Sequence, residues 1–233
     1  MSTRSYICRE NEDGTIVGVY CHSDGYIEHN GLFLYAFYKT LKQVNDLIGL
    51  GHLSTLGTNI GHQIDFNKRY VDTAYYEKVK YQCCAYSRDR GEEFCIDKWK
   101  SKEDCYKVGE EYIYIYRNNE WYVKMCGKKL QKLENVLKAN DYVRNKSYQE
   151  HYLTDTAILE DDRRRLLEAF TNLGVLDKAL KDSQFTTNAD YVVLEKVDAK
   201  NYKVRCTVNN SIVYLTKEDL IALQEEGCKV AKK

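Results

Sequence analysis

The chain has 233 residues, with 35 basic and 35 acidic side chains, and 43% of its residues are hydrophobic. This length allows one large domain or two small ones, and the even charge argues against generic nucleic-acid binding, which needs a basic excess. Without a membrane-spanning apolar run or an apolar signal region, we expect a cytoplasmic protein whose nine cysteines are free thiols.

The first predicted element is a β-hairpin from Ser5 to Cys21. Its turn would be Asp13-Gly14, a pair that favours a two-residue type I′ turn. That turn places Ile7 opposite Tyr20 and divides the side chains between two faces. Tyr20 and His22 would share one face, and the other would carry Tyr6, Cys8, Val17, Val19 and Cys21.

Helices and a loop are expected next. Asp24-Gly25 turns the chain, and Asn30 is suited to be the N-cap of a helix that begins near Leu32. A second short helix, Leu41 to Ile48, would be closed by glycines. Residues 51–67 lack apolar periodicity and predict a loop, with His52 and His62 exposed.

The middle of the chain predicts a strand at Val79–Tyr86, a helix start at Ser101 and a second hairpin, Glu111–Met125. With Asn118-Asn119 as its turn, Tyr116 pairs with Trp121 and Tyr114 with Val123. One face of this hairpin is then aromatic, and such cross-strand pairs stabilise a sheet.

The last third predicts helices at Leu130–Leu137 and about 156–180. Strands near Tyr191–Val197, Tyr202–Val208 and Ile212–Leu215 follow, and then a helix capped by Thr216. Residues 140–152 show no periodic spacing of apolar residues, and we place the domain boundary there. We therefore predict an α+β protein with a domain over residues 1–140, in which short helices cover an antiparallel sheet of β-hairpins. A smaller α+β module would occupy residues 141–233.

Aromatic and titratable side chains gather after the first hairpin, and they form the first candidate site. Its members are Tyr20, His22, Asp24, Tyr26 and His29. Histidine beside a carboxylate is typical of acid–base catalysis, but the same residues fit a structural turn or a binding surface. The sequence contains no serine-nucleophile or phosphate-loop motif.

The second candidate site is the charged stretch Arg88, Asp89 and Arg90. Guanidinium groups bind oxyanions bidentately, so these residues could hold a phosphate or a partner's acidic patch. Glu92 and Glu93 could instead neutralise them. No Cys-x-x-Cys or His-x-x-x-His pair occurs, and we expect neither a metal nor a cofactor. Arg163-Arg164-Arg165 is interpreted as a solvated helix face.

The run GVYCHSDGYIEHNGLFL, the Leu47–Gly57 stretch, the YSRDRGEE loop and a hairpin ending in EWYV follow one another within residues 5–125. In this order they resemble a family of small uncharacterised phage and prophage proteins. This resemblance implies a phage origin and no known chemistry. The leading hypothesis is a protein that occludes or redirects a host bacterial protein, such as a defence component. The alternatives are a protein that sequesters a nucleotide signal and an enzyme that uses His22 and Asp24.

Overall fold

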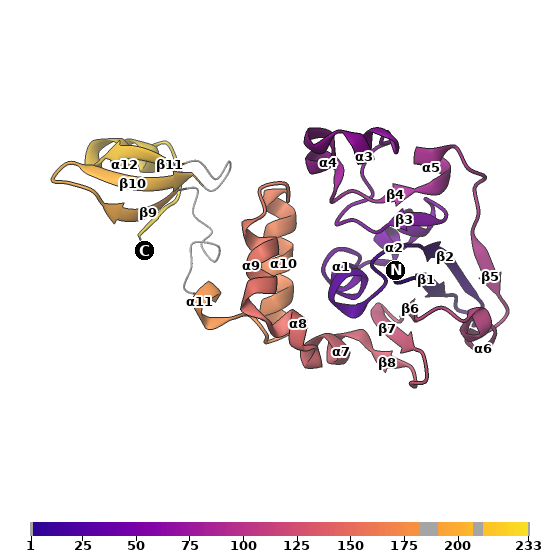
Figure 1. The fold of residues 1–233 in the computed structure, drawn as a ribbon. Helices are drawn as coiled ribbons and strands as arrows, with labels where there is room; N and C mark the ends of the chain where they lie inside the picture. The colour runs from indigo at the N-terminus through magenta and orange to yellow at the C-terminus, as the bar shows by residue number, and fades with distance from the viewer. Residues whose placement is uncertain (1, 182–190, 207–211, 233) are drawn as a thin grey trace.

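A mixed β-sheet organises most of the protein (Figure 1). The computed structural model describes residues 2–181, 191–206 and 212–232. The strands of this sheet are β1 (Ser5–Glu10), β2 (Ile16–Cys21), β3 (Leu53–Thr55), β4 (Cys84–Ala85), β5 (Asp97–Trp99), β6 (Tyr112–Arg117), β7 (Glu120–Met125) and β8 (Gln131–Lys132). They are ordered β4-β3-β2-β1-β6-β7-β8, and β5 pairs with β2. The α+β class is confirmed.

Helices pack on one face of this sheet and form the main core. They include the π-helix η1 (Ile27–Gly31), α1 (Leu32–Phe37), α2 (Leu41–Ile48), α7 (Leu133–Ala139), α8 (Asp141–Arg144), α9 (Lys146–Thr154), α10 (Glu160–Asn172) and α11 (Lys178–Lys181). Helix α1 buries five of its six residues. A helix can be apolar all round only where it is enclosed, and in Figure 1 α1 lies between the strands and α9–α10.

The opposite face of the sheet carries a smaller apolar cluster around Cys8, Ile16, Ile113 and Ile115. The segment α6 (Lys102–Cys105) and the 3₁₀-helix η2 (Tyr106–Val108) cover it. The remaining short helices of the first 181 residues are α3 (Lys68–Val71), α4 (Thr73–Val79) and α5 (Tyr86–Arg90).

The first hairpin forms, but its register differs by one residue from the expected one. Ile7 pairs with Val19, and Tyr6 pairs with Tyr20. The predicted faces were therefore correct for β2 and wrong for β1: Ile7 joins Val19 and Cys21 in the main core, whereas Tyr6 and Cys8 lie on the opposite face. Five residues, Asn11 to Thr15, separate the two strands, and the Asn11 N–H donates to the Thr15 carbonyl oxygen across this loop. Within the loop the Asp13 carboxylate accepts hydrogen bonds from the backbone and hydroxyl of Thr15. Of the expected turn pair, only Gly14 has positive φ.

The sheet is mixed rather than antiparallel throughout, which corrects the prediction of hairpins alone. Strand β1 runs parallel to β6, and β2 runs parallel to β3. The second hairpin was predicted correctly, since Tyr116 pairs with Trp121 and Tyr114 with Val123. Asn118 and Asn119 both have positive φ, as a type I′ turn requires.

Two further expectations were wrong. Asn30 lies inside η1 rather than at a helix N-cap, and its buried amide donates to the Ser5 hydroxyl. Residues 79–86 end α4 and contribute only the two-residue strand β4. The helix at 41–48 formed as expected, with a capping box between Thr40 and Gln43.

The segment after residue 140 divides between two apolar clusters. Side chains of α8, α9 and α10, including Val143, Leu153 and Phe170, belong to the main core. A second sheet comprises β9 (Tyr191–Lys196), β10 (Asn201–Cys206), β11 (Ile212–Thr216) and β12 (Val230–Lys232), with α12 (Lys217–Glu225). Three of its strands and the Thr216 cap were predicted; positions 207 and 208 of the expected middle strand lie outside the described residues.

The predicted solvated face at residues 163–165 was only partly correct. Arg164 is exposed, but Arg163 donates to the carbonyl oxygens of Asp155 and Ile158. Arg165 donates to the carbonyl oxygen of Phe37 and lies over the Phe37 ring. Through the described parts of the chain, no helix has the length and apolar character needed to cross a membrane.

Candidate functional site

The residues from Asp24 to His29 form a structural corner. Asp24 has a positive φ of 57°, and its carboxylate accepts a hydrogen bond from the Tyr26 hydroxyl at 3.2 Å. Gly25 is required here, because a Cβ at this position would lie 2.6 Å from the Arg4 carbonyl oxygen. Asn30 fixes the corner from inside by donating to Ser5 and to the Cys21 sulfur. These groups therefore bond mainly to one another.

His29 faces the main core from this corner. Its ring lies 4.4 Å from that of Phe33, and its Nδ1 contacts the Asn30 side chain at 3.0 Å. Burial lowers the pKa of His29, which favours the neutral ring. The Tyr148 hydroxyl donates to the carbonyl oxygen of the adjacent Glu28. Helix α9 thus covers the corner.

Tyr20 and His22 belong to a different group on the other face of the sheet. The Tyr20 hydroxyl lies 3.0 Å from His22 Nδ1, and burial raises the pKa of Tyr20. Within the parts of the chain that the structure describes, no hydrogen bond or ion pair joins His22 to Asp24. The acid–base pair that the sequence suggested is therefore not assembled by direct contact.

His52 joins the Tyr20 group, which the sequence did not predict. Its Nδ1 accepts a hydrogen bond from the backbone N–H of Tyr20 at 3.0 Å. Strands β5 and β3 pair with the same edge of β2 and leave a gap between them. β5 pairs at Gly18–Asp97, β3 pairs at Cys21–Leu53, and the Tyr20 N–H lies between these two pairs. His52 was expected to be exposed, but it is half-buried because its ring supplies the acceptor that neither strand provides.

His52, Cys95 and Asp97 bring three potential metal ligands within 4.8 Å of one another. The His52 ring does not fit a metal in this arrangement. Because Nδ1 accepts the N–H of Tyr20, the neutral ring carries its hydrogen on Nε2, which points to Asp97 Oδ2 at 3.5 Å. A metal-binding histidine instead donates from its second nitrogen. Asp97 Oδ2 also accepts from the Tyr6 hydroxyl, so the cluster works as a hydrogen-bond network.

Arg88 and Asp89, which the sequence offered as ligand-binding residues, bind each other and the backbone inside the fold. The Asp89 side chain is fully buried and accepts from the backbone N–H groups of Ile64 and Ala85. Arg88 binds both carboxylate oxygens at 2.9 Å and donates to the carbonyl oxygens of Ile60 and Cys83. This ion pair joins the loop before α3 to β4 and α5.

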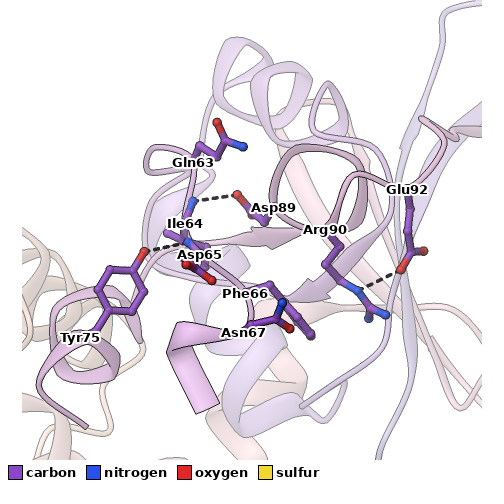
Figure 2. Close-up of a pocket in the computed structure, with 9 residues that line it drawn as sticks. All are labelled: Gln63, Ile64, Asp65, Phe66, Asn67, Tyr75, Asp89, Arg90 and Glu92. Atoms are coloured by element: carbon purple, nitrogen blue, oxygen red, sulfur yellow. Dashed lines mark hydrogen bonds and ion pairs between the residues drawn. The ribbon is translucent and has the colours of Figure 1, made fainter. Parts of the chain in front are cut away.

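Arg90 remains at the surface and lines a pocket of about 760 Å³ (Figure 2). Its guanidinium lies over the rings of Phe66 and Tyr86 and pairs with Glu92 at 2.9 Å. The pocket is lined by Gln63, Ile64, Asp65, Phe66, Asn67, Tyr75, Asp89, Arg90 and Glu92. Of the eight predicted site residues, only Asp89 and Arg90 line this pocket, and Asp89 is already satisfied.

Exposed apolar side chains lie on α3 and α4, the two short helices next to this pocket. Helix α3 buries none of its residues, and α4 buries only Val79. Tyr70 is 68% exposed and Val71 is 84% exposed. Tyr76 on α4 is also a large exposed hydrophobic residue. We call Tyr70, Val71, Tyr76 and the adjoining pocket the α3–α4 surface.

Aromatic and cationic groups link the α3–α4 surface together. The centre of the Phe66 ring lies 5.0 Å from that of the Tyr70 ring, and the Arg90 guanidinium lies over the Phe66 ring, 4.4 Å from its centre. Arg69 lies over Tyr76, and Lys68 lies over Tyr75. The sequence predicts no role for these residues, because short amphipathic segments resemble ordinary covering helices. Their exposure could be recognised only from the fold.

Comparison with protein-family models, curated proteins and solved structures yields no match for this chain. The function must therefore be inferred from the geometry of the protein itself and from the phage-family resemblance described above.

Proposed function

We propose that the protein is a phage-encoded binding protein that acts in the bacterial cytoplasm and occludes or redirects a host protein. A component of host defence is the favoured partner. The observation that carries the proposal is the α3–α4 surface, where Tyr70 and Val71 are exposed beside a pocket. Contiguous apolar exposure of this kind marks interaction sites. The phage assignment depends on the resemblance across residues 5–125.

The residue types at the α3–α4 surface favour a protein partner. Tyrosine and arginine are enriched at the energetically dominant positions of protein interfaces. Here Tyr70 packs on Phe66, and Arg90 is held between rings and Glu92, so these side chains are already ordered before binding. Ordering in advance reduces the entropy cost of association.

The charge of the pocket argues against a phosphate ligand there. Arg90 is already paired with Glu92, and Arg88 is used by Asp89. The exposed Asp65 adds a further carboxylate. The residues that line the pocket offer a phosphate no unpaired cation. The Asp65 carboxylate could instead form an ion pair with a basic side chain of a partner. We therefore expect a partner segment that presents apolar residues and a lysine or arginine.

The test is affinity capture of host proteins on the purified chain, followed by mass spectrometry. We expect a host protein to be retained by the wild-type chain and lost with Tyr70→Ser/Val71→Asp. Tyr142→Ser is the matched control, since Tyr142 is 66% exposed on α8 and lies outside the surface. Loss of a central interface aromatic typically weakens binding by about 2 kcal/mol or more.

The proposal fails if no host protein is enriched, or if the captured protein binds the Tyr70→Ser/Val71→Asp variant as strongly as wild type. Circular dichroism and thermal unfolding of each variant show whether the fold is retained. Because both substituted residues are exposed, we expect their melting temperatures to match wild type closely.

A further inference from the structure

We propose that the protein forms a dimer in which strand β11 of one chain pairs with β11 of a second copy. Strand β11 (Ile212–Thr216) is an outermost strand of the second sheet, whose order is β11-β10-β9-β12. Among the described residues it pairs with β10 alone, so its other edge presents backbone N–H and C=O groups without a strand partner. No residue of β11 belongs to the α3–α4 surface.

Strand β11 lacks the features that protect the other sheet edges. The other outermost strands, β4, β5, β8 and β12, contain two or three residues each, and very short strands offer little to pair with. Strand β11 has five residues and carries neither a charged side chain nor a proline. Tyr214 is 63% exposed and Ile212 is 42% exposed. A longer, uncharged, apolar edge favours the addition of another strand.

The side chains of β11 alternate between the two faces of this sheet. Val213 and Leu215 are half-buried and pack against the apolar cluster that includes Leu220 of α12. Ile212 and Tyr214 point to the other face, where both are exposed. A strand added at this edge would therefore extend the covered face and the exposed face together.

The sequence of β11 suits pairing with itself. A two-fold axis perpendicular to the sheet at Tyr214 makes the two strands antiparallel. Tyr214 then lies opposite the partner's Tyr214, Val213 opposite the partner's Leu215, and Ile212 opposite the partner's Thr216. Aromatic and β-branched side chains in such cross-strand pairs stabilise a sheet, and no like charges face each other in this register.

The small core of the second sheet gives this pairing a thermodynamic reason. Among the described residues, its apolar cluster has three buried members, Val193, Val204 and Leu220. Helix α12 buries one of its nine residues, Leu220. Small sheets with few buried side chains are marginally stable, and oligomerisation is one way to stabilise them. A sheet continued through β11 would bury more of Val213 and Leu215.

Sedimentation velocity of the full chain at about 1–500 µM tests the proposal. Five strand residues per chain make a small interface, so we expect monomers at low concentration and dimers at high concentration. Tyr214→Lys sets two like charges opposite each other and should weaken the dimer at least about 10-fold. Tyr142→Lys is the matched control, since it makes the same change at a tyrosine that is 66% exposed on α8, and it should dimerise like wild type.

A mixing experiment separates lost pairing from lost folding. Tyr214→Glu should also weaken the dimer when it is tested alone, because two carboxylates then face each other. An equimolar mixture of Tyr214→Lys and Tyr214→Glu should associate again, since opposite charges meet at the two-fold axis. Association of the mixture requires that both variants are folded, and circular dichroism of each variant checks this directly.

Three results would overturn the proposal. The first is a wild-type chain that remains monomeric over the whole concentration range, which would leave the β11 edge to a strand of another protein. The second is a dimer that persists in Tyr214→Lys; its loss in Tyr70→Ser/Val71→Asp would then place the contact on the α3–α4 surface. The third is a mixture of the Lys and Glu variants that stays monomeric although both variants are folded.

Discussion

Arg88 and Arg9 show the difference between an arginine whose donors are used inside the fold and one that makes no ion pair in the described residues. Arg88 binds Asp89 twice and donates to backbone carbonyl oxygens, so its donors are occupied. Arg9 has no ion pair in the described chain, and its Nε lacks an acceptor. The sequence drew attention to Arg88 because charges cluster around it. Unused hydrogen-bonding capacity, rather than local charge density, distinguishes the two.

The largest effect that follows from this comparison is expected for Asp89→Ala. The substitution removes the carboxylate that binds Arg88 and the backbone of Ile64 and Ala85. Loss of one partner of a buried ion pair should lower the free energy of unfolding by about 3–5 kcal/mol. Urea denaturation measures this change. Glu93→Ala, at an exposed position, is the control; a similar small change in both variants would contradict the structural role of Asp89.

A medium effect is expected for His52→Ala. The Tyr20 N–H would lose its acceptor between β5 and β3, at a cost of about 1–2 kcal/mol. His62→Ala, an exposed position, should leave stability unchanged. Thermal unfolding compares the two variants. Addition of Zn²⁺ to the wild-type chain should not raise its melting temperature; an increase that disappears in His52→Ala would instead show a metal site.

The smallest effect is expected for His22→Ala. His22 is half-buried and contacts the Tyr20 hydroxyl, so its loss should cost less than about 1 kcal/mol. Capture of the host protein should be unchanged, because the α3–α4 surface is not altered. Thermal unfolding and the capture assay measure these outcomes. Loss of host-protein binding in a folded His22→Ala variant would show that the partner binds the Tyr20 face of the sheet instead.

The two hairpins explain how much of the fold could be predicted from local sequence. Asn118 and Asn119 both adopt positive φ, so the expected two-residue turn and its register were correct. At Asp13-Gly14 only Gly14 does so, and the strands are joined by a five-residue loop within which the Asp13 carboxylate binds Thr15. A one-residue shift then moved side chains to the opposite face. The caps at Ser101 and Thr216 were easier to predict, since each depends on residues three apart.

The candidate sites were harder to predict because they depend on long-range pairing. Asp97 comes beside Gly18 only when β5 adds to β2. His52 meets Tyr20 in the gap that this pairing leaves. No local pattern encodes such neighbours. The sequence correctly placed Tyr20 and His22 together, but it grouped them with Asp24, which the chain turns toward the helical side.

The parallel pairing of β1 with β6 has a consequence for the order of events during synthesis. Ser5 pairs with Tyr112, 107 residues further along the chain. At translation rates of about 5–20 residues per second, the ribosome needs roughly 5–20 s to deliver this partner. Until then one edge of β1 is open, and contacts this distant in sequence form slowly. The N-terminal hairpin therefore keeps this edge of β1 unpaired until the middle of the chain has been synthesised.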